Sequence, residues 1–129
     1  MVSDKVGDFI VRLKNAEMVG KKEVVAPYSK LRHAIADKLK DTGYVAAVAA
    51  EGKTPVEKQL KVTLSGDERR INGVKRVSKP GRRLYAKVAD IHQVKFGKGH
   101  MILSTPAGIL TDEEARKQKV GGEQLFIIW

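Results

Sequence analysis

The chain closes with residues 111–129, TDEEARKQKVGGEQLFIIW, which contain a helix signal, a break and an apolar segment in that order. Thr111 and Glu114 have the spacing of a capping box, which predicts that a short helix begins here. Gly121-Gly122 interrupts this helix, and the β-prone residues Gln124 to Trp129 predict a final strand. A terminal strand so rich in apolar residues is expected inside a sheet, because an exposed edge of this kind would aggregate.

The residues before this run predict further strands, which would supply the rest of that sheet. The segments Ile71–Val77 and Leu84–Val88 flank a turn at Lys79-Pro80-Gly81, and every second residue of the latter segment is expected to face inward. Met101–Leu103 predicts a third strand, and a loop of small residues, Ser104–Gly108, is expected between this strand and the helix. The second half of the chain is therefore expected to be mostly strand.

The first half alternates helix and strand patterns. Residues near the N-terminus have the spacing of one buried helix stripe, with Ser3 as its cap and Gly20 at its end. A short strand, Glu23–Ala26, precedes a second helix that Ser29 caps and Gly43 ends. The stripes expected to be buried are Val6, Phe9, Ile10 and Leu13 in the first helix and Leu31, Ala34, Ile35 and Leu39 in the second.

Two more strands, Tyr44–Ala49 and Gln59–Leu64, are expected to pair, so that the two helices pack on a small sheet. The turn Ser65-Gly66-Asp67 is the predicted boundary between two parts of the chain. We therefore expect an α+β protein. Residues 1–66 would form an N-terminal two-helix α/β subdomain, and residues 67–129 would form a mostly antiparallel β subdomain with one short helix.

Positive charge is concentrated in residues 69–98, here called the basic segment. It contains ten Lys or Arg residues against one acidic residue, Asp90, so it carries nearly all of the net charge of +10. Self-repulsion in such a segment destabilises the fold unless a partner supplies counter-charge, and the phosphates of a nucleic acid would do so. Its cations are Arg69, Arg70, Lys75, Arg76, Lys79, Arg82, Arg83, Lys87, Lys95 and Lys98.

Composition argues against several other classes of protein. The chain has no Cys, which excludes disulfides and thiolate metal sites and is typical of a reducing compartment. The longest apolar run, Tyr44–Ala50, is far shorter than the ~20 residues that span a bilayer. Residues 1–20 resemble neither a signal peptide nor a transit peptide. We expect an intracellular soluble protein with no membrane association.

The chain offers few residues for catalysis. His33, His92 and His100 are isolated and lack metal-ligand spacing, so neither a metal nor any other cofactor is expected. Ser104 lies four positions from His100, and no third group completes a nucleophilic arrangement. The basic segment holds a single carboxylate, which leaves no pair for acid–base catalysis. The sequence therefore predicts that the protein is not an enzyme.

Aromatic residues are scarce in the basic segment, where only Tyr85 and Phe96 occur. Proteins that bind single strands by stacking normally present several exposed rings, so we expect recognition of a folded RNA or a duplex by shape and backbone contacts. Tyr85 points outward if Leu84 and Ala86 face inward, and a half-buried tyrosine in the sheet fits the same alternation equally well.

Two segments of small residues could approach RNA closely. Ser104 and Thr105 carry hydroxyls short enough to meet the wide minor groove of RNA, although an ordinary connection explains their loop equally well. Gly121-Gly122 permits backbone conformations that are closed to other residues. Glu123, which phosphates would repel, is expected to accept hydrogen bonds from backbone N–H groups or a base amino group, and a salt bridge is the alternative.

These motifs resemble the family of bacterial small-subunit ribosomal protein eight, in order along essentially the whole chain. In the second half the similar stretches are Lys75-Arg76-Val77-Ser78-Lys79-Pro80-Gly81, Ser104-Thr105-Pro106-Ala107-Gly108 and Gly121-Gly122-Glu123. In the first half they are Arg12-Leu13-Lys14-Asn15-Ala16, Gly20-Lys21-Lys22 and Pro27-Tyr28-Ser29-Lys30-Leu31. The chain departs from the family at Pro106, where a second serine is usual, and this change removes a hydroxyl and a backbone donor.

The resemblance implies a primary rRNA-binding protein that docks the central domain of small-subunit (16S) rRNA, contacts neighbouring ribosomal proteins and supports assembly of the subunit in the cytoplasm. The Ser-Thr loop and the Gly-Gly-Glu segment would meet an irregular RNA helix, and the N-terminal half would meet further rRNA helices. Some members of the family also bind a similar site on their own messenger RNA. The residues expected to bind RNA are Ser104, Thr105, Pro106, Gly108, Gly121, Gly122, Glu123, Lys75, Arg76, Lys79, Arg82, Tyr85, Arg12, Asn15, Ser29 and Lys30.

Two other functions are compatible with some of these features. A basic DNA-binding or nucleoid-associated module would bind duplex DNA, which lacks 2′-hydroxyls, with similar affinity. A small enzyme that acts on RNA would need turnover, for which the chain provides no convincing residues.

Overall fold

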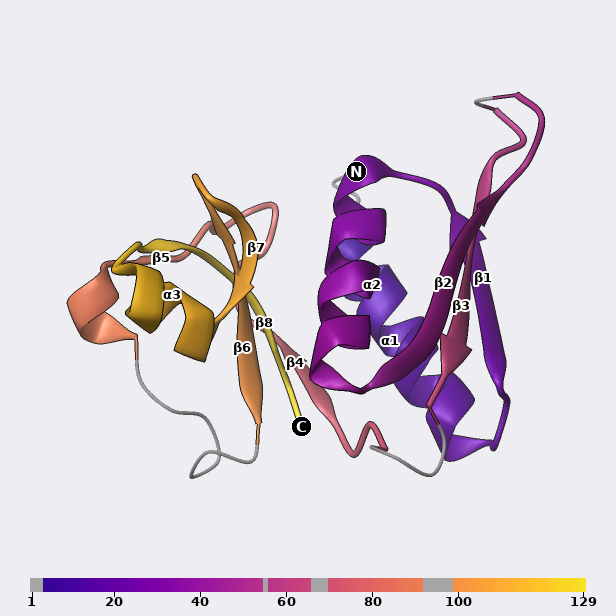
Figure 1. The fold of residues 1–129 in the computed structure, drawn as a ribbon, viewed down its shortest axis with the longest axis horizontal. Helices are drawn as coiled ribbons and strands as arrows, with labels where there is room; N and C mark the ends of the chain where they lie inside the picture. Colours follow the sequence, from indigo (N-terminus) through magenta and orange to yellow (C-terminus); the bar gives the residue numbers. More distant parts are fainter. Residues whose placement is uncertain (1–3, 55, 66–69, 92–98) are drawn as a thin grey trace. The chain divides into compact units, whose positions relative to one another are not determined.

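The computed structural model describes residues 4–54, 56–65, 70–91 and 99–129 (Figure 1). These residues contain α-helices and two antiparallel sheets, which confirms the predicted α+β class. Contacts divide the chain into an N-terminal unit, residues 9–71, and a C-terminal unit, in which residues 72–129 are joined by residues 1–8. In the predicted boundary turn Ser65-Gly66-Asp67, Gly66 and Asp67 lie outside the described residues.

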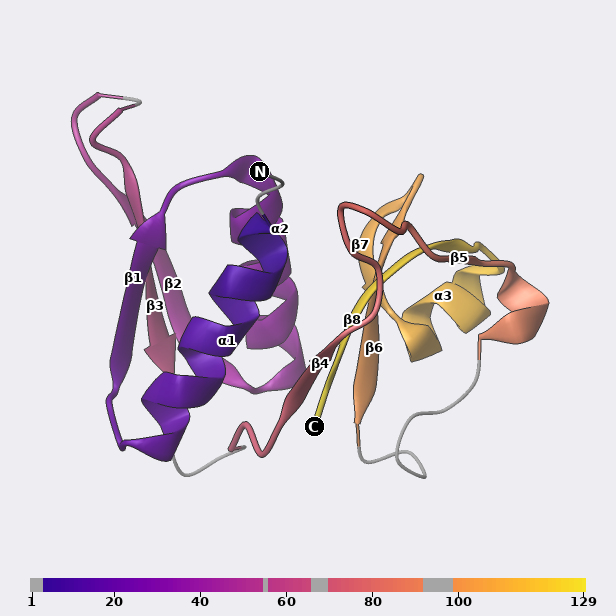
Figure 2. The same cartoon turned by 180° about the vertical axis from the view of Figure 1, so that it is seen from behind.

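The N-terminal unit consists of two helices and a three-stranded sheet. Its elements are α1 (Lys5–Met18, of which residues 5–8 are counted with the C-terminal unit), β1 (Glu23–Pro27), α2 (Lys30–Thr42), β2 (Val45–Glu51) and β3 (Gln59–Leu64). The strands are antiparallel in the order β1-β3-β2, so the predicted pairing of the last two strands is confirmed. Figures 1 and 2 show both helices on the same face of this sheet. Its most deeply buried side chains include Phe9, Ile10, Leu13, Ile35, Leu39, Leu60 and Val62.

Local signals set the ends of both helices. The Ser29 hydroxyl accepts a hydrogen bond from the Arg32 N–H at 3.1 Å, and Gly43 ends α2 in a left-handed conformation, φ 95°. Gly20, φ 76°, follows the last turn of α1 in the same way. These three predictions are confirmed because a cap depends only on residues within one turn of the helix end. The cap predicted at Ser3 lies outside the described residues.

The buried stripe of α2 differs from the prediction at two positions. Leu31 is 42% exposed and Ala34 is only half-buried, whereas Arg32 and Ala36 are buried, so the predicted burial of Leu31 and Ala34 is wrong. The Arg32 guanidinium donates a hydrogen bond to the Pro27 carbonyl at 2.6 Å, which satisfies its charged end while the aliphatic part of the side chain packs inward.

The C-terminal unit is built around its last strand, β8. Its elements are β4 (Val74–Arg76), β5 (Tyr85–Ala86), a short 3₁₀ helix η1 (Val88–Asp90), β6 (His100–Thr105), β7 (Gly108–Thr111), α3 (Asp112–Gln118) and β8 (Gly122–Ile128). The sheet has the order β4-β8-β6-β7, and β5 also pairs with β8. The final apolar strand therefore lies inside the sheet, as predicted.

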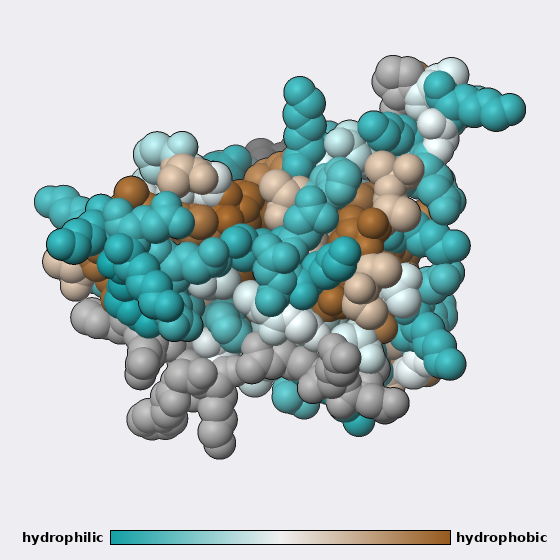
Figure 3. All heavy atoms as spheres, viewed as in Figure 1, coloured by the Kyte–Doolittle hydropathy of each residue, from teal (hydrophilic) through white to brown (hydrophobic). Residues whose placement is uncertain are grey.

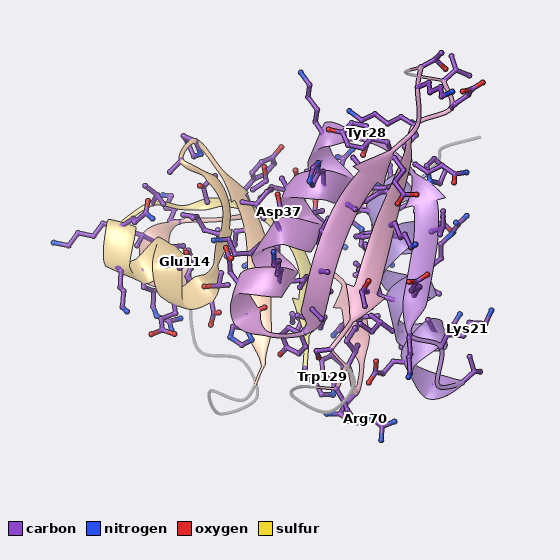
Figure 4. The ribbon with its side chains drawn as sticks, turned by 45° about the vertical axis from the view of Figure 1, so that its right-hand side comes forward. Lys21, Tyr28, Asp37, Arg70, Glu114 and Trp129 are labelled. Carbon is purple, nitrogen blue, oxygen red and sulfur yellow. The ribbon has the colours of Figure 1, made fainter. Side chains whose placement is uncertain are left out.

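Helix α3 packs against β6 and β7 and closes the core of this unit. Thr111 and Glu114 form the predicted capping box: the Thr111 hydroxyl accepts from the Glu114 N–H, and the Glu114 carboxylate accepts from the Thr111 N–H. Figure 4 shows Glu114 on this helix. One core cluster of this unit consists of the buried residues Ala86, Ile91, Leu103, Leu110 and Ala115, and Ile102, Leu125, Phe126 and Ile128 are buried as well.

Two predicted strands are much shorter in the structure. Strand Ile71–Val77 is reduced to β4, and Leu84–Val88 is reduced to β5, because both pair with β8 and not with each other. Ala86 lies opposite Gly122, which is the first residue of β8. The residues that follow Ala86 therefore have no residue of β8 to pair with. Val88 instead begins η1 and is exposed, which corrects its predicted inward position.

The predicted loop Ser104–Gly108 is a β-hairpin turn. Strand β6 continues to Thr105, which pairs with Gly108 at the start of β7, and α3 follows β7 directly. Proline suits the first turn position of such a connection because its ring already holds φ near the required value. Gly108 has φ 113°, a conformation that favours glycine.

Candidate nucleic-acid interface

Strand β8 brings three of the predicted RNA-binding residues into one row. Glu123 lies opposite Tyr85 of β5 on one side and opposite Ser104 of β6 on the other. Directly opposed residues of antiparallel strands have their side chains on the same face, so these three form one lateral row. Tyr85 is 71% exposed, which settles its orientation in favour of solvent. We call these three residues the central row.

Gly121 and Gly122 let β8 approach both of its neighbours. A Cβ added to Gly122 would lie 2.2 Å from the Ser104 carbonyl oxygen, and one added to Gly121 would lie 2.3 Å from the Ala86 carbonyl oxygen. Neither glycine is among the described residues with positive φ. The two glycines are therefore needed for space and not for an unusual backbone conformation.

The hairpin turn between β6 and β7 uses its two hydroxyl residues differently. The Thr105 hydroxyl donates to the Gly108 carbonyl at 2.7 Å and accepts from the Ala107 N–H at 3.1 Å, so it closes the turn. The Ser104 hydroxyl makes no hydrogen bond within the described residues, and Pro106 is exposed. Ser104 therefore has donor and acceptor capacity left for a partner.

The predicted cations of the C-terminal unit are not equivalent. Lys75, Lys79 and Arg82 are exposed, and none of them forms an ion pair with a carboxylate in the described part of the chain. Arg76 is largely buried: its Nε lies 3.0 Å from the Asp4 carboxylate, and its Nη1 donates to the Leu125 carbonyl at 2.5 Å. Three cations are thus available to phosphates, whereas Arg76 is engaged in the fold.

Asp4 is held in its charged form by this arrangement. Partial burial raises the pKa of Asp4, but hydrogen bonds from the Arg76 side chain and the Gly7 N–H lower it, as do the charges of Arg76 and Arg83. The net result is a pKa below the ordinary value of an aspartate. Asp4 and Arg76 therefore remain an ion pair at neutral pH.

Glu123 is linked to the segment between β4 and β5. Its carboxylate Oε2 accepts a hydrogen bond from the Ser78 hydroxyl at 2.5 Å and lies 3.2 Å from Nη1 of Arg83. Ser78 is fully buried, and its oxygen also accepts from the Leu84 N–H at 3.1 Å. The site prediction did not include Ser78 or Arg83, because no local pattern connects them with a glutamate on another strand.

The remaining predicted residues belong to the N-terminal unit. Arg12 and Asn15 line a hollow of about 500 Å³ between α1 and β1, together with Lys21, which Figure 4 shows at the turn between these elements. Arg12 also donates to the Val25 carbonyl at 3.1 Å. Ser29 is the cap of α2, and Lys30 is exposed at the first turn of that helix. These residues form a second set, which belongs to the N-terminal unit, whereas the central row belongs to the C-terminal unit.

Other features of the surface fit a polar interface. Figure 3 shows hydrophilic side chains gathered over α3 of the C-terminal unit.

In the described ranges, no three His, Asp or Glu side chains are grouped so that they could hold a metal ion. None of the helices in those ranges is long and apolar enough to cross a membrane. Residues 69 and 92–98 of the basic segment lie outside the described residues, among them Arg69, His92, Lys95, Phe96 and Lys98.

Comparison with known proteins assigns the chain to a family. Residues 4–129 match the family described as ribosomal protein S8. A protein of Mycoplasmopsis synoviae named small ribosomal subunit protein uS8 is 44% identical, covering 99% of this chain and 98% of its own length. Proteins with the same name from Nitratidesulfovibrio vulgaris and Clavibacter michiganensis are 44% and 45% identical, with coverage of at least 98% of each chain.

These similarities define the class of the protein, which is a structural protein of the ribosome and not an enzyme. More narrowly, the chain belongs to the ribosomal protein S8 family. The family resemblance found in the sequence is thereby confirmed.

Proposed function

We propose that this protein is a constituent of the small ribosomal subunit in the cytoplasm, where it binds the central domain of small-subunit rRNA and supports assembly. The central row is the observation that carries the proposal. It places Tyr85 and Ser104, which come from two segments that were each predicted to bind RNA, on the strands that flank β8 at Glu123.

The surface offers a distinct chemistry for each part of an RNA helix. The cations Lys75, Lys79 and Arg82 would bind phosphates, which position the protein without reading sequence. Ser104 could hydrogen-bond to a 2′-hydroxyl or a base edge in the minor groove, which is wide and shallow in RNA. Tyr85 presents an exposed ring on which a base or sugar could stack.

The N-terminal unit would provide further contacts of its own. Arg12, Asn15 and Lys21 line one hollow together with Glu23, whose carboxylate lies 3.6 Å from Nζ of Lys61 and is thus partly neutralised. A hollow of this kind suits a phosphate group of a further rRNA helix. Ser29 would contribute mainly by capping α2, at whose first turn Lys30 is exposed.

The direct test is to footprint the purified protein on total cellular RNA and then to titrate it with a transcript of the rRNA central domain. We expect protection within the central domain, and tighter binding of this transcript than of a DNA duplex of equal length at the same salt concentration. Equal affinity for the DNA duplex would instead favour a DNA-binding module.

The same surface would bind any messenger RNA that reproduces the rRNA site. We propose that the messenger encoding this chain is such a ligand, and that neighbouring small-subunit proteins are its partners on the particle. A transcript of the chain's own operon should compete with the labelled central-domain transcript. Absence of competition at a large excess would reject the messenger site and leave the rRNA proposal intact.

A further inference from the structure

Glu123 is an unexpected residue in a protein that binds a polyanion, because its charge repels phosphates. Its side chain is only 18% exposed and already has two protein partners, Ser78 and Arg83. A carboxylate so engaged has little free capacity for a base amino group. Its role therefore has to be sought in what those partners do.

Ser78 and Arg83 stand on either side of a tight turn. Lys79 and Arg82 exchange two backbone hydrogen bonds, of 3.0 and 2.9 Å, and so close a turn over Pro80-Gly81. We call the segment from Lys79 to Arg82 the basic turn. Its two cationic side chains are both exposed.

The basic turn is joined to β8 at both of its ends. Before the turn, the Ser78 N–H donates to the Gln124 carbonyl at 2.9 Å; after it, the Gln124 N–H donates to the Leu84 carbonyl at 2.9 Å. The Ser78 hydroxyl spans the gap, because it accepts from the Leu84 N–H while donating to Glu123. Removing Glu123 would leave this buried hydroxyl without its acceptor, at a site that solvent does not reach.

We propose that Glu123 is a positioning residue: through Ser78 and Arg83 it fixes the basic turn, and thereby the two cations that bind RNA phosphates. The inference rests on the proposed function. It assigns Glu123 no contact with RNA, and it explains why a negative charge is present next to the basic turn. The negative charge of Glu123 slightly lowers the electrostatic attraction between the protein and RNA phosphates. Its hydrogen bonds hold Lys79 and Arg82 in one arrangement.

The key experiment measures binding of the central-domain transcript with Glu123→Ala introduced into two backgrounds, the parent chain and a Lys79→Ala/Arg82→Ala variant. Glu123→Ala should weaken binding and reduce the salt slope by about 2, because two phosphate contacts lose their geometry. The same substitution in a Lys79→Ala/Arg82→Ala background should have no further effect. If Glu123 touched a base directly, its loss would weaken binding equally in both backgrounds, which would overturn the inference.

Conservative variants separate positioning from charge. Glu123→Gln keeps an oxygen acceptor for Ser78 and should bind RNA nearly as the parent chain does, and Ser78→Ala should reproduce the loss seen in Glu123→Ala. Gln124→Ala is the matched control. This neighbour on β8 contributes backbone hydrogen bonds to the turn, which alanine keeps, so RNA binding should be unchanged. Tighter RNA binding by both Glu123→Ala and Glu123→Gln would show that the residue acts only as a repelling charge, and the inference would fail.

A measurement without RNA keeps the inference separate from the proposed function. In Glu123→Ala the Leu84 amide should exchange its hydrogen faster than in the parent chain, while amides of α3 should keep their rates. Unchanged Leu84 exchange would overturn the positioning role even if RNA binding is established. Faster exchange combined with no RNA binding by the parent chain would reject the proposed function and leave the structural link standing.

Discussion

Lys75 and Arg76 are adjacent in the sequence, yet their side chains have different surroundings. Lys75 is exposed, whereas Arg76 contacts Asp4 and the Leu125 carbonyl. We expect Lys75→Ala to weaken RNA binding and to lower the salt slope by ~1, with an unchanged melting temperature. Arg76→Ala should lower the free energy of unfolding by about 1–3 kcal/mol, because a partly buried carboxylate loses its partner.

Titrations at several salt concentrations and urea unfolding of both variants test this difference. The two substitutions remove the same charge, so each serves as the control for the other. Equal salt slopes and equal stabilities in the two variants would contradict the distinction between an available cation and an engaged one.

Asp4 should make stability depend on pH in the acidic range. Its pKa is lower in the folded chain than in the unfolded chain, so the folded state binds its proton less readily. Asp4 therefore contributes stability above its unfolded pKa, near 4, and this contribution is lost as the pH falls through the folded value. Between pH 6 and pH 3, Asp4→Asn should lose less free energy of unfolding than the parent chain. An equal loss in urea titrations at the two pH values would refute this assignment.

The hairpin of β6 and β7 provides a test at the level of an element, because its two hydroxyls have separate roles. Ser104→Ala should reduce RNA affinity by the equivalent of about 0.5–1.5 kcal/mol while leaving both the fold and the salt slope unchanged. Thr105→Ala should also destabilise the chain, since the turn loses the bonds to Gly108 and Ala107. Thr105→Ser should restore the stability. Thermal unfolding and RNA titration of the three variants would show a mistaken division of roles if Ser104→Ala alone unfolded the hairpin.

The spacing of β8 from its neighbours leads to a second prediction for this sheet. Gly122→Ala should lower the free energy of unfolding by about 1–3 kcal/mol, because the added methyl group would collide with the backbone of β6. Gly81→Ala is the matched control: a Cβ there meets no atom within 4 Å. Urea unfolding should therefore separate the two variants, and equal stability would mean that β6 and β8 can move apart at little cost.

Sequence patterns predicted the elements wherever the signal is local. Caps at Ser29 and Thr111 and the end at Gly43 depend on a few neighbouring residues, so they were recognised without knowledge of the fold. The lengths of β4 and β5 were not predicted correctly, since both depend on where β8 begins and ends. Leu31 was misplaced for a related reason: a shift of one residue along a helix rotates a side chain by about 100°.

The same limit applies to the candidate site. Motifs along the chain indicated most of its residues, because loops of small residues and exposed cations are visible in the sequence itself. The link between Ser78 and Glu123 was not predictable, since 45 positions separate the two residues and the bond follows from strand pairing. Arg76 shows the converse: the sequence identifies a cation, whereas only the structure shows that Asp4 already pairs with it.

For the molecule as a whole, the net charge of +10 should couple stability to salt in two opposite directions. Like charges in the free protein repel one another, and salt screens them over a Debye length of ~10 Å at 0.1 M, so the melting temperature of the free protein should rise with added salt. A bound central-domain transcript supplies the missing counter-charge and should stabilise the fold by ~2.7 kcal/mol at a concentration of 100 times Kd. Salt weakens that complex, so the increment from RNA should shrink as salt is added.

Thermal unfolding at low and high salt, with and without the transcript, measures both effects. A DNA duplex of equal length is the control and should give the smaller increment. If the stabilisation by the transcript does not change with salt, phosphate contacts contribute little to binding. That result would contradict the role proposed for the basic turn.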